Sequence, residues 1–150
     1  MKLATALSER ADLQIRLSQL SSRLNSNAKV QEGENPSEKP EDLLDELDQI
    51  INRMEELIAR INKTNSSTFV DGVSITEMLA KRDALTNKIR VLREFLSMAS
   101  NKVDRYSTKE ILIKSTVDVA KLQKTVDALS KQLRELDEAI QQANWNTDLL

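Results

Sequence analysis

The sequence predicts an all-α protein of four long antiparallel helices, arranged either as one helical bundle or as coiled-coil hairpins. Three observations support this fold class. Apolar residues recur at alternating steps of three and four in four segments, polar breaks separate these segments, and Ala, Glu, Lys, Leu and Arg together form close to half of the 150 residues. This composition and this spacing are typical of long helices that pack on one another. Residues 1–150 are expected to form a single helical domain.

Each segment carries its own heptad-type series of apolar residues. The segments extend over about Lys2–Leu24, Glu41–Ile61, Glu77–Ser100 and Asp118–Ala143, and their series are Leu3, Ala6, Leu13, Leu17, Leu20 and Leu24; Leu44, Leu47, Ile51, Met54, Ile58 and Ile61; Met78, Leu85, Ile89, Leu92, Leu96 and Ala99; and Val119, Leu122, Val126, Leu129, Leu133, Leu136, Ile140 and Ala143. The second segment has a second series beside the first, formed by Leu43, Ile50 and Leu57. Two series predict a wide buried face with more than one neighbouring helix.

The first two breaks have different characters. Residues 25–40 contain both prolines and one of the two glycines, which predicts a flexible loop with Pro40 as the first residue of the next helix. Residues 63–75 predict a short β-hairpin, because two β-prone runs flank the turn signal Asp71-Gly72. Ser74 and Glu77 match a capping box, so the third helix is expected to begin directly after the hairpin.

The third break, residues 101–116, separates the last two helices. Its run Glu110–Lys114 is β-prone and allows a further short strand. Ser115, with Asp118 three residues later, resembles a helix cap. Basic residues surround a single aromatic side chain here, so Arg105, Tyr106 and Lys109 are candidate contacts for an anion such as a phosphate.

Composition excludes several classes of site. The chain contains neither Cys nor His, which excludes disulfides, thiolate nucleophiles, Cys/His zinc sites and imidazole bases. We expect no cofactor and no enzyme activity. With 22 basic against 24 acidic residues the net charge is -2. Nucleic-acid binders usually carry an excess of basic residues, and because this chain has none, we expect no nucleic-acid partner. Glu9, Arg10 and Asp12 interrupt the N-terminal segment where a signal peptide is apolar, and no window is long and apolar enough for a membrane span, so a cytoplasmic protein is expected.

Two arginines occupy core-type positions of the heptad series. Arg10 and Arg82 are each expected to have a carboxylate partner or to lie near solvent, because an unpaired buried charge is costly. Asp83, Glu55 and Asp127 are candidate partners between which the sequence does not choose. Acidic clusters elsewhere alternate with Lys and Arg and predict a solvated, salt-bridged helix surface.

Side-chain hydrogen-bonding groups are dense just before the hairpin. Asn62, Thr64 and Asn65, together with the pair Arg82-Asp83, are therefore the candidate polar site for a ligand or an assembly contact. The alternative interpretation is structural: the segment reverses the chain and caps the third helix.

The stretches RINKTNSSTFVDGVSITEMLAKRDAL, DRYSTKEILIKSTVDVAKLQK and NWNTDLL resemble a small bacterial family of unknown function, whose members sometimes carry the label septicolysin. The resemblance covers nearly the whole chain and implies a helical, heptad-rich protein. It provides no agreed catalytic residues. The label itself implies a cytolysin that permeabilises membranes.

Three functional hypotheses follow. The first is a structural or interaction protein, a helical bundle that forms homo-oligomers through its remaining apolar helix faces. The second is a septicolysin-like, membrane-permeabilising cytolysin, although the residues themselves predict no membrane partner. The third is a nucleic-acid binder with a helical arm, similar in outline to the tRNA-binding hairpin of seryl-tRNA synthetase, although the charge balance predicts no nucleic-acid partner.

Overall fold

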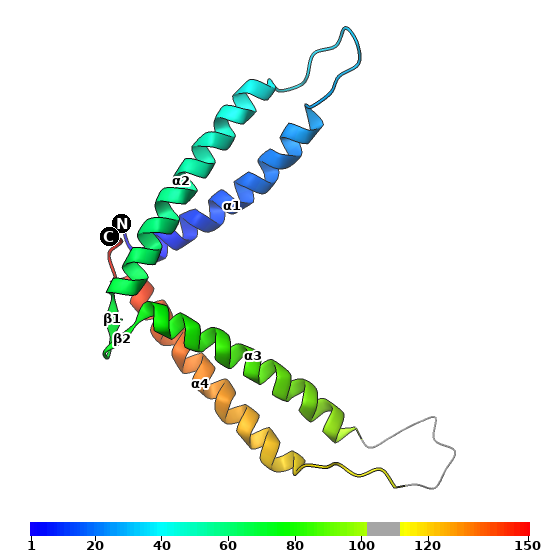
Figure 1. Ribbon diagram of the computed structural model, residues 1–150, viewed down its shortest axis with the longest axis vertical. Coiled ribbons are helices and arrows are strands. Elements are labelled where there is room, and N and C mark those ends of the chain that lie inside the picture. The colour runs from blue at the N-terminus through cyan, green and yellow to red at the C-terminus, as the bar shows by residue number, and fades with distance from the viewer. Residues whose placement is uncertain (102–111) are drawn as a thin grey trace. The chain divides into compact units, whose positions relative to one another are not determined.

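The computed structural model describes residues 1–101 and 112–150. In chain order its elements are α1 (Leu3–Ser26), α2 (Pro40–Ser67), β1 (Phe69–Val70), β2 (Val73–Ser74), α3 (Ile75–Ser100) and α4 (Val119–Asn146) (Figure 1). The predicted all-α fold class is confirmed, as is the small β-hairpin between the second and third helices.

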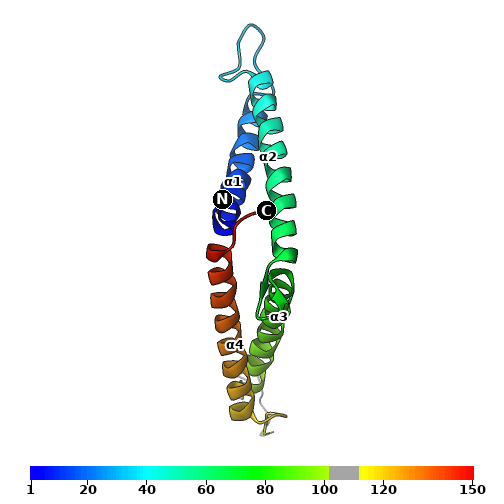
Figure 2. The same ribbon diagram turned by 90° about the vertical axis from the view of Figure 1, so that its left-hand side faces the viewer.

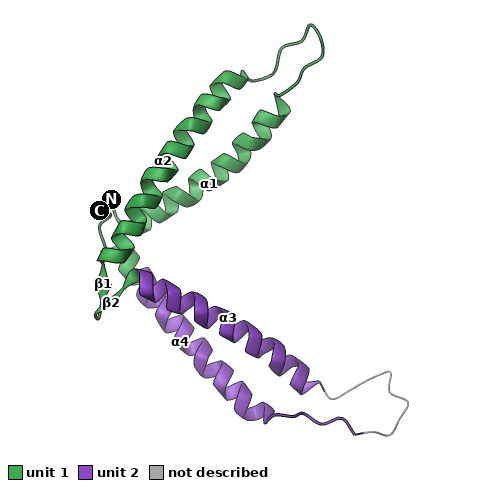
Figure 3. Cartoon of the chain, viewed as in Figure 1, with its two compact units in different colours: residues 1–75, 142–150 green, residues 76–141 purple. Residues whose placement is uncertain are grey.

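The chain divides into two compact units, each built on one helical hairpin (Figure 3). Unit 1 consists of residues 1–75 and 142–150 and contains α1, α2 and the β-hairpin, whereas unit 2 consists of residues 76–141 and contains most of α3 and α4. In the views of Figures 1 and 2, α1 lies beside α2 and α3 lies beside α4. The expected single domain stays a prediction.

The core of unit 1 lies between α1 and α2. Its buried apolar residues on these helices are Leu3, Ala6, Leu13 and Leu20 of α1 and Leu43, Ile50, Leu57 and Ile61 of α2. The structure therefore corrects the expectation that both apolar series of α2 are buried. Leu44, Ile51 and Ile58 are 50, 43 and 39% exposed. A helix buries only the stripe that faces a neighbour, and within unit 1 the neighbouring helix of α2 is α1.

An arginine of α2 joins the two helices of unit 1 at mid-length. The Nε and Nη2 atoms of Arg53 donate to the two carboxylate oxygens of Glu9 at 2.6 and 3.0 Å, and its Nη1 donates to Glu56 at 2.7 Å. These hydrogen bonds lower the pKa of both Glu9 and Glu56 from the ordinary value of 4.5. Charge-assisted, bidentate pairs of this kind fix the alignment of the two helices.

A second arginine ties the loop to the helices at the far end of unit 1. Arg23 donates from Nε and Nη2 to the two carboxylate oxygens of Glu38 at 3.0 and 2.6 Å, and from Nη1 to Glu46 at 3.2 Å. Hydrogen bonding to Arg23 lowers the pKa of Glu38. The side chain of Asn27 accepts from the Glu38 amide at 3.0 Å, so both ends of residues 27–39 are held. The next helix begins at Pro40, as predicted.

The β-hairpin has the predicted turn. Phe69 pairs with Ser74 and Val70 with Val73, and Asp71 and Gly72 have positive φ angles of 51° and 81°. Positive φ at both central residues defines the type I′ turn, which Asp-Gly favours. The α3 helix begins at Ile75, directly after Ser74, where the sequence placed it.

Unit 2 has a smaller set of buried residues between its two helices. Met78, Ile89 and Leu96 of α3 and Val126 and Ile140 of α4 are buried. A hydrogen bond of 3.1 Å from Arg93 to the hydroxyl of Ser130 connects the two helices. Among the described residues, the apolar seam and this hydrogen bond therefore join the two helices of unit 2.

The segment before α4 differs from the sequence prediction in two respects. The Oδ1 atom of Asp118 accepts from the Lys121 amide at 3.1 Å, so Asp118 rather than Ser115 caps α4. Residues 112–114 form no strand, and the rest of the β-prone run, residues 110 and 111, lies outside the described residues. Leu112 and Ile113 are exposed. β-prone side chains alone do not form a strand where no partner strand pairs with them.

Candidate interaction surface

The predicted polar site begins with Thr64, which proves to be a structural contact. Thr64 is fully buried; its hydroxyl donates to the Arg60 carbonyl at 2.8 Å and accepts from the Leu150 amide at 3.0 Å. The Arg60 Nε atom donates to the main-chain oxygen of Leu150 at 2.7 Å. Two residues of α2 therefore hold Leu150, and the Thr64 hydroxyl has both its donor and its acceptor role filled.

The same region of unit 1 brings together the first and last residues of the chain, a contact that we call the terminal junction. The amide of Leu3 donates to the Thr147 carbonyl at 2.9 Å, and the amide of Leu149 donates to the Met1 carbonyl at 2.8 Å. Between them, the Lys2 ammonium lies 3.0 Å from a carboxylate oxygen of Asp148. Sequence reasoning missed this junction because no local pattern signals a pairing between residues about 145 positions apart.

The other four residues of the predicted polar site are divided between the two units. Asn62 is exposed and Asn65 is half-buried. Arg82 and Asp83 belong to unit 2, where Nε and Nη2 of Arg82 donate to one oxygen of Asp83 at 3.1 and 3.0 Å. Of the three candidate partners for Arg82, the structure therefore selects Asp83, and the pair lies near solvent. The grouping of the five residues as one site stays a prediction.

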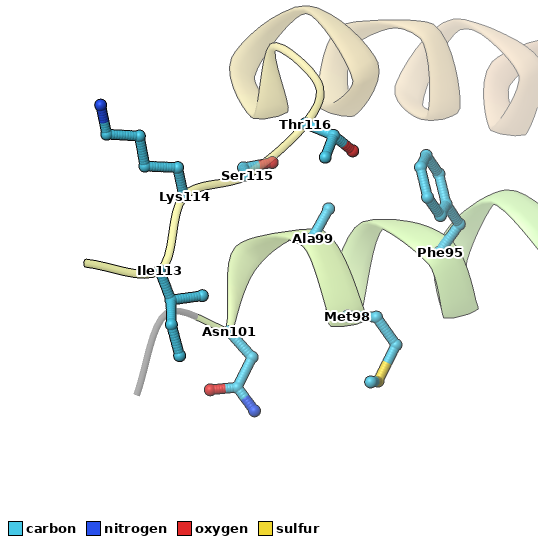
Figure 4. Close-up of a pocket in the computed structure, with 8 residues that line it drawn as sticks. All are labelled: Phe95, Met98, Ala99, Asn101, Ile113, Lys114, Ser115 and Thr116. Carbon is cyan, nitrogen blue, oxygen red and sulfur yellow. The ribbon is translucent and has the colours of Figure 1, made fainter. Parts of the chain in front are cut away.

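The predicted anion contacts, Arg105, Tyr106 and Lys109, lie outside the described residues. Among the described residues, a pocket of about 230 Å³ opens at the end of unit 2 (Figure 4). It is lined by Phe95, Met98, Ala99, Asn101, Ile113, Lys114, Ser115 and Thr116. Figure 4 shows Phe95 and Ala99 directed toward Ser115 and Thr116, whereas Met98 is directed away from them. Its volume is below the roughly 300 Å³ at which ligand pockets begin.

Two apolar rows run along exposed helix faces. On α2 the apolar row consists of Leu44, Ile51 and Ile58, and on α3 it consists of Ala84, Val91 and Met98. Members of each row are seven residues apart, which places them one above the other on a helix. Val91 is 53% and Met98 73% exposed. The apolar side chains of each row are therefore aligned on one face of their helix.

A charged row accompanies each apolar row, three residues earlier in the sequence. Glu41, Asp48 and Glu55 form the acidic row of α2, and Lys81 and Lys88 form the basic row of α3, where the third position, three residues before Met98, is the exposed Phe95. All five side chains are exposed, and within residues 1–101 and 112–150 none of them forms an ion pair, in contrast to Glu46 and Glu56 on another face of α2. The predicted salt-bridged surface thus exists on one face of α2 and not on the other.

Two further findings concern other kinds of site. Among the residues that the structure describes, no three acidic side chains lie close enough together to hold a metal ion. Across the same residues, every helix is too short or too polar to cross a membrane.

Known proteins provide a family and a fold. No curated protein matches the chain. The chain is similar to a crystal structure described as that of a functionally unknown conserved protein from Corynebacterium diphtheriae, with 40% sequence identity and a TM-score of 0.93, over 100% of this chain and 99% of that one. Residues 10–149 match a family of unknown function (DUF6847), and the protein belongs to this family.

Proposed function

We propose that the protein is a non-enzymatic structural or interaction protein that forms homo-oligomers through the apolar rows of its helices. The apolar row of α2 is the observation that carries this proposal. Its three large aliphatic side chains are 39 to 50% exposed, on a helix whose neighbouring series already forms the core of unit 1. Single exposed apolar residues are normal on a protein surface, whereas aligned ones mark interaction sites.

Heptad spacing favours another helix as the surface that covers the row. Residues seven apart keep one seam facing a partner helix along its length, and aliphatic side chains at these positions pack into the gaps of that partner. Each copy of the chain carries such helices, so a second copy provides a suitable partner surface. The absence of Cys and His from the sequence supports the non-enzymatic part of the proposal, and a cytoplasmic location belongs to it as well.

Light scattering behind a sizing column tests the proposal. The wild-type protein is expected to show a mass that is a multiple of 17.0 kDa. The variant Leu44→Gln/Ile51→Gln/Ile58→Gln should shift toward 17.0 kDa with unchanged helical circular dichroism, because the exposed row is removed and the core is not.

Ile15→Gln provides the matched control. Ile15 is 57% exposed on α1 and belongs to neither row, so its substitution should leave the mass unchanged. A wild-type protein that stays at 17.0 kDa at high micromolar concentration would rule out the proposal.

Two other functions remain predictions, and no contact among the described residues favours them. Cytolytic activity, which the septicolysin label implies, predicts dye leakage from liposomes at submicromolar protein. Nucleic-acid binding by a helical arm predicts a gel shift that strengthens as salt is lowered, because released counterions drive such binding.

A further inference from the structure

The exposed faces of α2 and α3 have apolar rows with the same spacing and charged rows of opposite sign. Each carries an apolar row with a charged row three residues earlier, and the charges are acidic on α2 and basic on α3. We propose that the α2 face of one copy binds the α3 face of a second copy, with the two apolar rows in contact and the acidic row beside the basic row. This inference rests on the proposed self-association and adds which faces meet.

The arrangement of the rows determines the direction of the pairing. On both helices the charged row lies on the same side of the apolar row, because it precedes it by three residues in each case. When two such faces meet in parallel, the charged row of one helix lies opposite the uncharged side of the other. When they meet antiparallel, the two charged rows come together. The α2 and α3 faces therefore pair antiparallel, since only that direction brings the carboxylates to the ammonium groups.

The charges select unlike faces over like ones. Two α2 faces would bring six carboxylates of two acidic rows together, and two α3 faces would bring four lysines together. Like charges opposite each other destabilise a helix pair, whereas opposite charges beside an apolar seam determine which helices pair. Because Asp48, Glu55, Lys81 and Lys88 have no ion-pair partner among the described residues, they are available for contacts between copies.

Two separate variants, each of which reverses the charge of one row, test the pairing between copies. Variant A is Asp48→Lys/Glu55→Lys, which keeps Glu41 and makes both charged rows net basic, and variant B is Lys81→Glu/Lys88→Glu, which makes both charged rows acidic. In about 50 mM salt, each variant alone should self-associate at least about tenfold more weakly than the wild type, because attraction becomes repulsion.

An equimolar mixture of A and B is the decisive sample. Every α2 face of one variant then meets an oppositely charged α3 face of the other, so association should return to within about threefold of the wild type. Sedimentation equilibrium of the two variants alone and mixed measures this recovery. A contact between the rows inside a single chain would not be restored by mixing.

Matched controls carry the same change in charge at exposed positions outside the rows. Glu32→Lys/Glu34→Lys matches variant A, and Lys121→Glu/Lys124→Glu matches variant B. Both controls should associate as the wild type does.

The possible failures are distinct. If the wild type associates and variants A and B associate equally well, or if their mixture stays monomeric, the pairing of α2 with α3 is wrong while self-association stands. If the wild type is a monomer, both proposals are wrong.

Discussion

The two helical hairpins of this protein are held by different means. In unit 1, Arg53 and Arg23 each form a forked contact with a glutamate of another element, and the terminal junction closes the other end. In unit 2, the described ion pairs Arg82–Asp83, Arg90–Glu94 and Lys131–Glu135 lie within single helices, and the contact between helices is a hydrogen bond from the charged Arg93 to the uncharged hydroxyl of Ser130. Polar contacts therefore align the helices of unit 1, whereas the helices of unit 2 rely on their apolar seam.

The largest expected effect concerns the seam of unit 1. Leu57 is fully buried between α1 and α2, so Leu57→Ala removes buried methyl groups and leaves a cavity. We expect the free energy of unfolding to fall by about 2–5 kcal/mol, measured by urea denaturation. Ile58→Ala, at the neighbouring exposed position, should lower it by no more than about 1 kcal/mol. Equal losses would show that the two apolar series of α2 are buried to the same extent.

A smaller loss is expected at the terminal junction. Thr64→Val keeps the shape of the side chain and removes the hydroxyl that accepts the Leu150 amide. Leaving that amide without its acceptor should cost about 1–2 kcal/mol and speed hydrogen exchange at Leu150. Thr125→Val in α4 is the control, because the Thr125 hydroxyl bonds only within its own helix. Unchanged exchange at Leu150 would show that Thr64 does not hold it.

The glutamates of unit 1 should make stability depend on pH. Because the folded pKa values of Glu9, Glu38 and Glu56 lie below 4.5, their contribution is fully present above that value and is lost as the pH falls through the lowered values. Urea midpoints should therefore drop between pH 5 and pH 3, and less so for Glu9→Gln. Adding Arg53→Gln to Glu9→Gln should make the drop smaller still, because Glu56 then also loses the hydrogen bond to Arg53 that lowers its pKa. An identical drop in wild type and Glu9→Gln would exclude the Arg53 pair as a source.

The smallest effect is expected in unit 2. Ser130→Ala removes the hydroxyl that accepts a hydrogen bond from Arg93 near the surface. The free energy of unfolding should therefore change by about 0.5 kcal/mol or less. Thermal unfolding by circular dichroism measures it. A loss above about 1 kcal/mol would mean that unit 2, like unit 1, depends on a polar contact between its helices.

Local patterns predicted most of the fold. Apolar spacing located the four helices, Pro40 marked the start of α2, and Asp71-Gly72 predicted the turn, because each of these signals acts within a few residues. The choice between the two apolar series of α2 was beyond the sequence. Leu43 and Leu44 are chemically identical, and only the position of α1 decides which of them is buried.

The candidate site was less predictable than the fold. Thr64 was selected for its hydrogen-bonding group, and its partner proved to be the distant Leu150 rather than a ligand. The charged rows are visible in the sequence as Glu41, Asp48 and Glu55, but spacing alone does not show which carboxylates are already paired. Only the structure separates paired from unpaired carboxylates, because it shows that Arg23 donates to Glu46 and Arg53 donates to Glu56.

The division of the chain has a consequence for the order in which the protein folds. Unit 2 is one continuous stretch, residues 76–141, whereas unit 1 needs residues 142–150 to complete it. During synthesis α1 and α2 emerge before unit 2, yet the groups that close their junction emerge after it. Contacts between residues so far apart in sequence form slowly, because the entropy cost of closing a long loop comes before the contacts stabilise the chain. Unit 1 is therefore completed only by residues that follow unit 2 in the chain.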